Sequence, residues 1–278
     1  MLVLHTLGGL SVEGSAAAEG FLQRPRVLSL LALLAGNGPG GVVRECVLAL
    51  LWPESDSCRA RASLKQLAFQ ARRLGGLPIV LGNGGMVRLD AGLVGVDVWE
   101  LEAAARRGDR SALVRAYGGP FADGFVAPPE LDELSRWIER RRAAVRHRYQ
   151  SALSALCTEA AAAGDMDALI GHRRRLADLD PLSSRAALSL MHVLVAAGDR
   201  PAALATARSH ARRVRVELDA DPDPTLLRFE RELRRLTSAE LPADVAPLDA
   251  PHVADLTLVR GRRPVTRAAD GRDWLNGG

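Results

Sequence analysis

One segment is especially informative about the architecture of this chain: Trp52-Pro-Glu-Ser-Asp-Ser-Cys-Arg-Ala-Arg-Ala-Ser-Leu-Lys-Gln-Leu-Ala-Phe-Gln-Ala-Arg-Arg-Leu74. Pro53 ends the apolar run before it, because proline cannot continue a helix. Asp56 or Ser57 can accept hydrogen bonds from the free N–H groups of a new helix, residues 57–74. We therefore expect a helix, a short acidic loop and a second helix in this order.

The second predicted helix has one apolar and one basic face. With a step of about 100° per residue, the apolar face collects Ala60, Leu64, Leu67, Ala68, Ala71 and Leu74. The opposite face carries Arg59, Ala62, Lys65, Gln66, Phe69 and Arg73. An amide can read adenine, an arginine can read guanine or hold phosphate, and a small alanine allows close approach to a DNA groove. The same pattern also fits an ordinary solvated basic face.

Positive charge is concentrated in this helix and not in the chain as a whole. The net charge is only +4 over 278 residues, and Lys65 is the only lysine among 37 basic residues, so richness in arginine means little by itself. Between Ser57 and Gly75 there is no Asp or Glu, but five cations: Arg59, Arg61, Lys65, Arg72 and Arg73. The missing acids favour contact with nucleic acid.

A β-hairpin is predicted directly after the helix, within residues 78–90. Asn83-Gly84 separates two β-prone runs, and both residues of such a turn need positive φ. Arg88 lies on the returning strand, where it can reach a phosphate or the minor groove. A basic helix followed by a β-ribbon is typical of winged-helix DNA-binding domains, although any surface hairpin gives the same local signal.

The length of 278 residues suggests two domains. The first, residues 1–95, is predicted to contain a small sheet from the apolar pieces 2–7 and 10–13, helices at 24–35 and 44–52, and a short linker at 91–95. The second, residues 96–236, is predicted to be all-α, with helices at 97–106, 110–117, 129–163, 166–178, 182–197, 200–218 and 225–236. Residues 237–278 lack periodicity and are predicted to be disordered.

The helical part contains a repeat. Ala163-Gly164-Asp165 recurs as Ala197-Gly198-Asp199, an offset of 34 residues. A helix–turn–helix period of this length is typical of tetratricopeptide repeats, which stack and leave a groove for a partner. An unrelated helical bundle, in which Ala-Gly-Asp happens to end two helices, remains the alternative.

The sequence gives only weak support for a nucleotide-binding, metal or catalytic site. Gly36, Gly38 and Gly41 match a dinucleotide-binding pattern, but they follow a helix and Pro39 interrupts them. The six histidines show no metal-ligand spacing, the three cysteines form no Cys-x-x-Cys pair, and no nucleophile–base set stands out. We therefore expect no enzymatic activity, no cofactor and no metal. Reduced thiols and the lack of a signal-peptide pattern lead us to expect a cytoplasmic protein.

Several motifs resemble one family in their order along the chain. They are Leu4-His-Thr-Leu-Gly-Gly-Leu-Ser-Val-Glu-Gly14, Leu50-Leu-Trp-Pro-Glu-Ser-Asp56, Tyr117-Gly-Gly-Pro-Phe-Ala-Asp-Gly-Phe125, Trp137-Ile-Glu-Arg-Arg-Arg142 and Val216-Glu-Leu-Asp-Ala-Asp-Pro-Asp-Pro224. Together they resemble the SARP-type transcriptional regulators, in which an OmpR-like winged helix leads into a bacterial transcriptional activator domain. The resemblance covers roughly residues 1–236.

The resemblance implies tandem protomers on direct repeats near a promoter, and hence self-association on DNA. It implies a contact between Arg44 and the DNA backbone. It also implies an RNA polymerase contact by the loop Trp52, Pro53, Glu54, Ser55 and Asp56. Phe69 and Gln70 stand where the family often has a Tyr-Arg pair, so its base preference does not carry over.

The sequence thus predicts a mainly α protein, with an N-terminal winged helix-turn-helix (α+β) followed by an all-α tetratricopeptide-like helical repeat domain. Its predicted function is transcriptional activation on double-stranded DNA, at the nucleoid. The predicted DNA contacts are Arg44, Arg59, Arg61, Ala62, Lys65, Gln66, Phe69, Gln70, Arg72, Arg73 and Arg88. The alternative is a helical-repeat scaffold whose winged helix no longer binds DNA, which the modest net charge and Phe69 on the basic face also fit.

Overall fold

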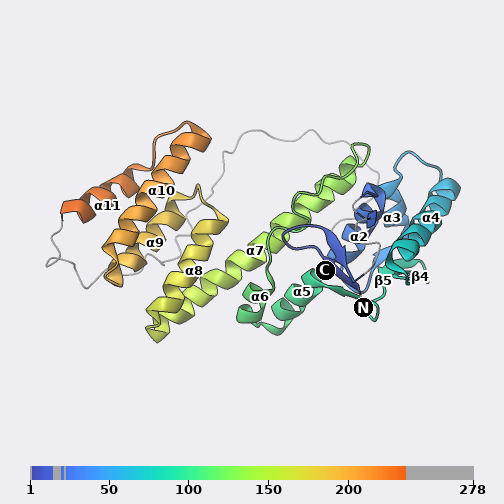
Figure 1. Cartoon of the computed structure of the whole chain (residues 1–278), viewed down its shortest axis with the longest axis horizontal. Helices are drawn as coiled ribbons and strands as arrows, with labels where there is room; N and C mark the ends of the chain where they lie inside the picture. The colour runs from blue at the N-terminus through green and yellow to red at the C-terminus, as the bar shows by residue number, and fades with distance from the viewer. Residues whose placement is uncertain (1, 15–19, 22, 236–278) are drawn as a thin grey trace, which may run out of the picture. The chain divides into compact units, whose positions relative to one another are not determined.

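The computed structural model of the chain describes residues 2–14, 20–21 and 23–235. The predicted disordered tail, residues 237–278, lies outside the described residues. In the residues that the structure describes, two small sheets and the helices α2, α3 and α4 come first, and a series of further helices follows (Figure 1). It is mainly α, as the sequence predicts.

A three-stranded sheet holds the N-terminal residues. Strand β1 (Leu2–His5) pairs antiparallel with β2 (Ser11–Glu13) and parallel with β6 (Val94–Val96), in the order β2-β1-β6. The prediction of a linker at 91–95 is therefore wrong for its last two residues, which belong to β6. These residues belong to a strand because burial holds it against the core: Val94 and Val96 are each only 3% exposed.

The winged helix-turn-helix predicted from the sequence is confirmed. Its helices are α2 (Pro25–Gly36), α3 (Arg44–Leu51) and α4 (Ser57–Gly75). A second sheet follows the order β3-β5-β4, built from β3 (Val42–Val43), β5 (Met86–Leu89) and β4 (Val80–Asn83). In Figure 1, α4 is next to the β4–β5 hairpin.

The turn of the hairpin is one residue later than predicted. Asn83 pairs with Met86 across the hairpin, so the two turn residues are Gly84 and Gly85. Both have positive φ, 57° and 83°. Glycine adopts such angles without the steric cost that a Cβ atom imposes on asparagine, which explains the shift.

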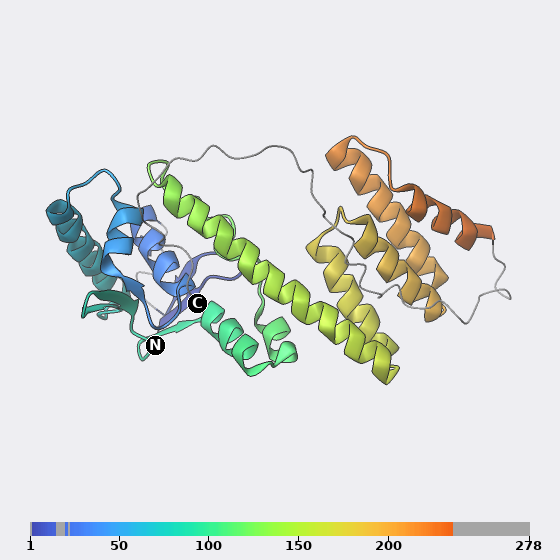
Figure 2. The ribbon, with the colours of Figure 1, turned by 180° about the vertical axis from the view of Figure 1, so that it is seen from behind.

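The rest of the described chain is helical. Neighbouring helices pack in sequence, and both views show α9 and α10 side by side (Figures 1 and 2). The helices are α5 (Asp97–Arg107), α6 (Arg110–Ala116), α7 (Asp132–Ala163), α8 (Met166–Leu179), α9 (Ser184–Ala196), α10 (Arg200–Leu218) and α11 (Pro224–Arg235).

The Gly-Asp repeat forms the same turn each time. Gly164 and Gly198 end α7 and α9 with φ of 70° and 79°. The following Asp165 and Asp199 accept hydrogen bonds from backbone N–H groups three residues on, each at 3.0 Å, and so begin α8 and α10. Residues Gly108-Asp109 form a third such turn, between α5 and α6, which the sequence analysis missed. Among the described residues, three pairs of neighbouring helices are therefore joined by a Gly-Asp turn: α5–α6, α7–α8 and α9–α10.

One hydrophobic cluster runs through the winged helix and into the helical part. Its centre is α2, whose residues from Val27 to Ala35 are all buried. Leu134, Ile138 and Val145 of α7 belong to the same cluster. Two smaller clusters lie further along, one within α9, α10 and α11 and one around Cys157. The winged helix thus shares its core with the long helix α7.

Asp97, the first residue of α5, ties the N-terminal sheet to the helical part. Its carboxylate accepts hydrogen bonds from the backbone N–H groups of Thr6 and Leu7 at 2.8 and 2.9 Å and from the Thr6 hydroxyl at 2.5 Å. It also accepts one from the N–H of Val98 at 2.7 Å. Because Thr6 is fully buried, these donors have few other partners than Asp97.

The glycine-rich segment after α6, residues 117–125, makes a second contact with the chain at the end of β1. Gly8 donates its N–H to the carbonyl of Pro120 at 2.9 Å. A Cβ atom on Gly8 would come within 2.5 Å of the Gly118 carbonyl oxygen, and one on Gly119 within 2.6 Å of the Gly8 Cα, so the two backbones meet only because Gly8 and Gly119 are glycine. Arg142 of α7 donates to the carbonyls of Phe121 and Phe125 at 2.9 and 3.0 Å and holds this loop.

We predict that Asp97→Ala lowers the free energy of unfolding by about 2–4 kcal/mol, because it leaves buried N–H groups without an acceptor. Asp97→Asn, which replaces one accepting oxygen with a donor, should be intermediate. Urea unfolding followed by circular dichroism measures both. The control is Asp167→Ala, an exposed residue in the first turn of α8, expected to change stability by less than about 0.5 kcal/mol. Equal effects of Asp97→Ala and Asp167→Ala would contradict the assignment.

Candidate nucleic-acid interface

Helix α4 begins at a well-formed cap. The Asp56 carboxylate accepts hydrogen bonds from the N–H groups of Cys58 and Arg59 at 3.0 and 2.9 Å. These bonds satisfy donors that have no partner inside the helix. At the other end, Gly76 adopts the left-handed conformation with φ of 71° and ends the helix.

The two faces of α4 lie as the sequence analysis expected. Ala60, Leu64, Leu67 and Ala71 are buried, whereas Ala68 and Leu74 are half-buried. The outer face is exposed throughout: Arg59, Ala62, Lys65, Gln66, Phe69 and Arg73. Arg72 is exposed as well. The apolar face therefore fixes the helix in the domain and leaves the basic face free for a partner.

Three of the predicted cations meet at one cleft. It has a volume of about 500 Å³ and lies between the start of α3, the side of α4 and the hairpin. Arg44, Arg61 and Lys65 line it. Gly82 of the hairpin faces Arg44, and a Cβ atom at this position would be in ordinary van der Waals contact with the guanidinium, at 3.6 Å. The Arg44 N–H also donates to the carbonyl of Gly85 at 2.7 Å, which fixes the start of α3 at the turn.

Two acidic side chains partly offset the cations on this side of the molecule. Glu45 of α3 lies 3.7 Å from the guanidinium of Arg61, and Asp56 lies 3.2 Å from that of Arg59. All four side chains are more than half exposed, so each ion pair is screened by water and contributes little to stability. Arg59 and Arg61 can therefore exchange these partners for a phosphate at small cost.

Arg88 does not join the cleft. Val87 and Gly82, which pair across the hairpin, both line it. Successive residues of a strand point to opposite faces, so Arg88 and its partner Leu81 face the other way. The structure thus brings Arg44, Arg61 and Lys65 together and places Arg88 on the outer face of the wing.

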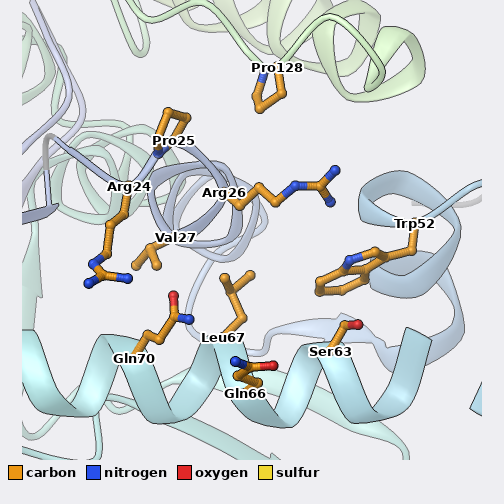
Figure 3. Close-up of a pocket in the computed structure, with 10 residues that line it drawn as sticks. All are labelled: Arg24, Pro25, Arg26, Val27, Trp52, Ser63, Gln66, Leu67, Gln70 and Pro128. Carbon is orange, nitrogen blue, oxygen red and sulfur yellow. The ribbon is translucent and has the colours of Figure 1, made fainter. Parts of the chain in front are cut away.

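The opposite flank of α4 borders a second groove, which has a volume of about 610 Å³. Figure 3 shows Gln66 and Gln70 of α4 on one side of it and Arg24 and Trp52 on the other. The two glutamines therefore lie on a different flank of the helix from Lys65. Arg24, which precedes α2 and lines this groove, is not among the contacts predicted from the sequence.

Arg26, which lines the same groove, has hydrogen-bond partners within the protein. Its guanidinium donates to a carboxylate oxygen of Glu130 at 2.5 Å and to the carbonyl of Leu51 at 3.2 Å. Hydrogen bonds from its own backbone N–H and from Arg26 hold the pKa of Glu130 below its ordinary value. This pair joins the start of α2 to the residues before α7.

The loop before α4 is open to solvent. Pro53, Glu54, Ser55 and Asp56 are exposed, and Trp52 is half-buried at the groove of Figure 3. The N–H of Ser55 donates to the Trp52 carbonyl at 3.2 Å, which makes the loop a tight turn. A partner can therefore reach the loop and the groove together.

Within residues 2–14, 20–21 and 23–235, no group of three or more His, Cys, Asp or Glu side chains is placed to hold a metal ion. In the same residues, no helix combines the length and the apolar character that a membrane crossing requires.

Comparison with known families gives one match in sequence. The profile of the bacterial transcriptional activator domain matches residues 96–234, which is half of the chain. The match begins at the last residue of β6 and ends within α11. No curated protein matches the chain.

Among solved structures, the chain is similar to Mycobacterium tuberculosis EmbR in complex with a low-affinity phosphopeptide. The TM-score is 0.49 and the sequence identity is 20%. The similarity covers 85% of this chain and 66% of the EmbR chain, so the chain spans a little less than two thirds of that protein's length.

We predict that Asp56→Ala lowers the free energy of unfolding by about 1 kcal/mol, because α4 loses its cap, and that Asp56→Ser retains most of the stability. Urea unfolding measures the change. Glu54→Ala, in the same exposed loop, is the control and should have little effect. If Asp56→Ala were as stable as Glu54→Ala, the cap would have no energetic role.

Proposed function

The chain belongs to the bacterial transcriptional activator domain family, and from this premise we propose that it is a SARP-type transcriptional regulator that binds specific sites on double-stranded DNA. The observation that carries the proposal is the cleft in which Arg44, Arg61 and Lys65 meet beside the hairpin. Arg61 and Lys65 lie on one flank of α4, which has no acidic residue between Ser57 and Gly75, and Arg44 borders the same cleft from the start of α3. Such a surface is complementary to the phosphate backbone.

Helix α4 has the form that the major groove accepts. A helix with its side chains is about 10–12 Å across, and the major groove is about 12 Å wide. With the outer face turned into the groove, Ala62, Phe69 and Arg73 point at the base edges. The cleft cations then lie beside one phosphate strand, where they set the position of the helix.

The remaining predicted residues make further contacts with DNA in this proposal. Arg88 reaches a phosphate from the outer face of the wing. Gln66 reads a base edge from the flank of α4 that borders the second groove, where Gln70 also lies. Arg59 and Arg72, both exposed, extend the positive surface along the helix.

We further propose that the loop Trp52–Asp56 contacts RNA polymerase. The support is its exposure, its acidic Glu54 and its place next to the groove of Figure 3. A loop at the start of α4 stays accessible when the outer face of α4 lies on DNA. Protomers would then self-associate on direct repeats near a promoter, with the helical repeats as further contact surface.

A scaffold without DNA binding is the rival proposal. The observation that favours it is the large exposed area of Phe69, which is 59% exposed on the proposed DNA face. A scaffold uses such apolar area to hold a protein partner. The two proposals differ in one measurable property, because only a DNA-binding protein loses affinity for DNA steeply as salt rises.

We predict that the protein binds its selected DNA with an affinity that falls steeply with salt, with a log–log slope of about −0.9 per phosphate neutralised. Lys65→Ala or Arg73→Ala should weaken binding by about 1–3 kcal/mol, and loss of a phosphate contact by Lys65 should reduce the slope by about one. Fluorescence anisotropy with a labelled duplex at several salt concentrations measures both quantities.

Arg174→Ala provides the matched control, because Arg174 is an exposed arginine on α8. It should leave the affinity and the slope unchanged. Wild-type affinity in a folded Lys65→Ala/Arg73→Ala double variant would show that this face of α4 does not bind DNA. Absence of DNA binding by the folded wild-type protein would favour the scaffold.

A further inference from the structure

Phe69 is the most unusual residue on the outer face of α4. Its side chain is 59% exposed. It belongs to none of the three hydrophobic clusters formed by the described residues. The fold therefore gains little from this ring, since apolar surface is stabilising only when it is removed from water.

The surroundings of Phe69 are basic. Lys65 lies one helical turn before it, and Arg72 and Arg73 lie one turn after it, all exposed. Ala62, two turns before, adds a small exposed side chain on the same face. An apolar ring inside a rim of cations is complementary to a ligand with apolar groups between anionic strands, and the floor and walls of a DNA groove have this arrangement.

One group on the major-groove edges of the bases is apolar: the 5-methyl group of thymine. The other groups that the bases present there are hydrogen-bond donors and acceptors, which a phenyl ring cannot satisfy. We propose that Phe69 is a specificity-determining residue that selects thymine at one position of the DNA site by covering its methyl group. This inference rests on the proposed function.

The helix geometry places this thymine relative to the neighbouring contacts. Arg73 is four residues beyond Phe69, a rise of about 6 Å along the helix axis. Successive base pairs are about 3.4 Å apart. Because a helix lying along the major groove offers residues one turn apart to bases that are successive or nearly so, the selected thymine is about one to two base pairs from the base or phosphate that Arg73 contacts, and about as far, in the other direction, from the contact of Lys65.

The test replaces thymine by deoxyuridine, which lacks only the 5-methyl group. The probe is a labelled duplex of the selected site, with each thymine replaced in turn. Wild-type protein should lose about three- to fivefold in affinity at one position of each repeat, the effect of uncovering one methyl group. Phe69→Ala should bind all duplexes more weakly and show no further loss at that position.

Two further variants serve as controls. Phe69→Leu keeps an apolar side chain and should retain part of the sensitivity to deoxyuridine. Val126→Ala truncates another exposed apolar side chain, which lies between α6 and α7 and is 83% exposed. This variant should retain the full sensitivity to deoxyuridine. Because Phe69 is exposed and alanine favours helix, Phe69→Ala should stay folded, which circular dichroism checks.

The outcomes separate this inference from the proposed function. If wild-type protein binds no DNA, the proposed function fails and the inference with it. If it binds with a steep salt dependence but no position responds to deoxyuridine, the thymine contact is wrong and the proposed function stands. The inference is also overturned if Phe69→Ala keeps the wild-type sensitivity to deoxyuridine at the same position. A Phe69→Ala variant that loses only self-association would overturn it as well.

Discussion

The carboxylate of Asp97 is the constraint on which the arrangement of this protein depends. It accepts hydrogen bonds from the buried end of β1 and at the same time begins α5, so the N-terminal sheet and the helical part share one polar anchor. The close contact of Gly8 with Gly118 and the hydrogen bond from the Trp99 indole to the carbonyl of Ala35, at 2.8 Å, act in the same place. The winged helix is therefore supported by the helical part through polar contacts as well as through a common core.

That support explains how the basic helix α4 can present different surfaces on its two flanks. The buried face of α4 is fixed in the shared core, which leaves the outer face and both flanks available. One flank carries Arg61 and Lys65, which share the cleft with Arg44 of α3, and the other carries Gln66 and Gln70 beside Trp52. In the function we propose, the first flank lies along a phosphate strand. The loop Trp52–Asp56, at the start of the helix, remains open to a protein partner.

Much of this architecture could be predicted from local signals. Pro53, the Asp56 cap and the spacing of the apolar residues determine α4, and the Gly-Asp repeats determine two of the helical hairpins. Contacts between distant segments could not be predicted. The sequence does not show that Asp97 meets Thr6, because nothing in a carboxylate identifies a donor some ninety residues away. The strand β6 was missed for the same reason, since three residues form a strand only when β1 is beside them. The split of the α4 contacts between two flanks also depends on the position of the hairpin and of α2, which local patterns do not give.

The most direct test of the central claim is to select genomic DNA fragments with the purified, folded protein at about physiological salt. The account predicts enrichment of a short direct repeat, with copies spaced by about one helical turn, roughly 10–11 base pairs. Such a result would establish site-specific binding and identify the promoters concerned. Recovery of fragments without any common sequence, or of none, from a protein whose fold is intact would contradict the account.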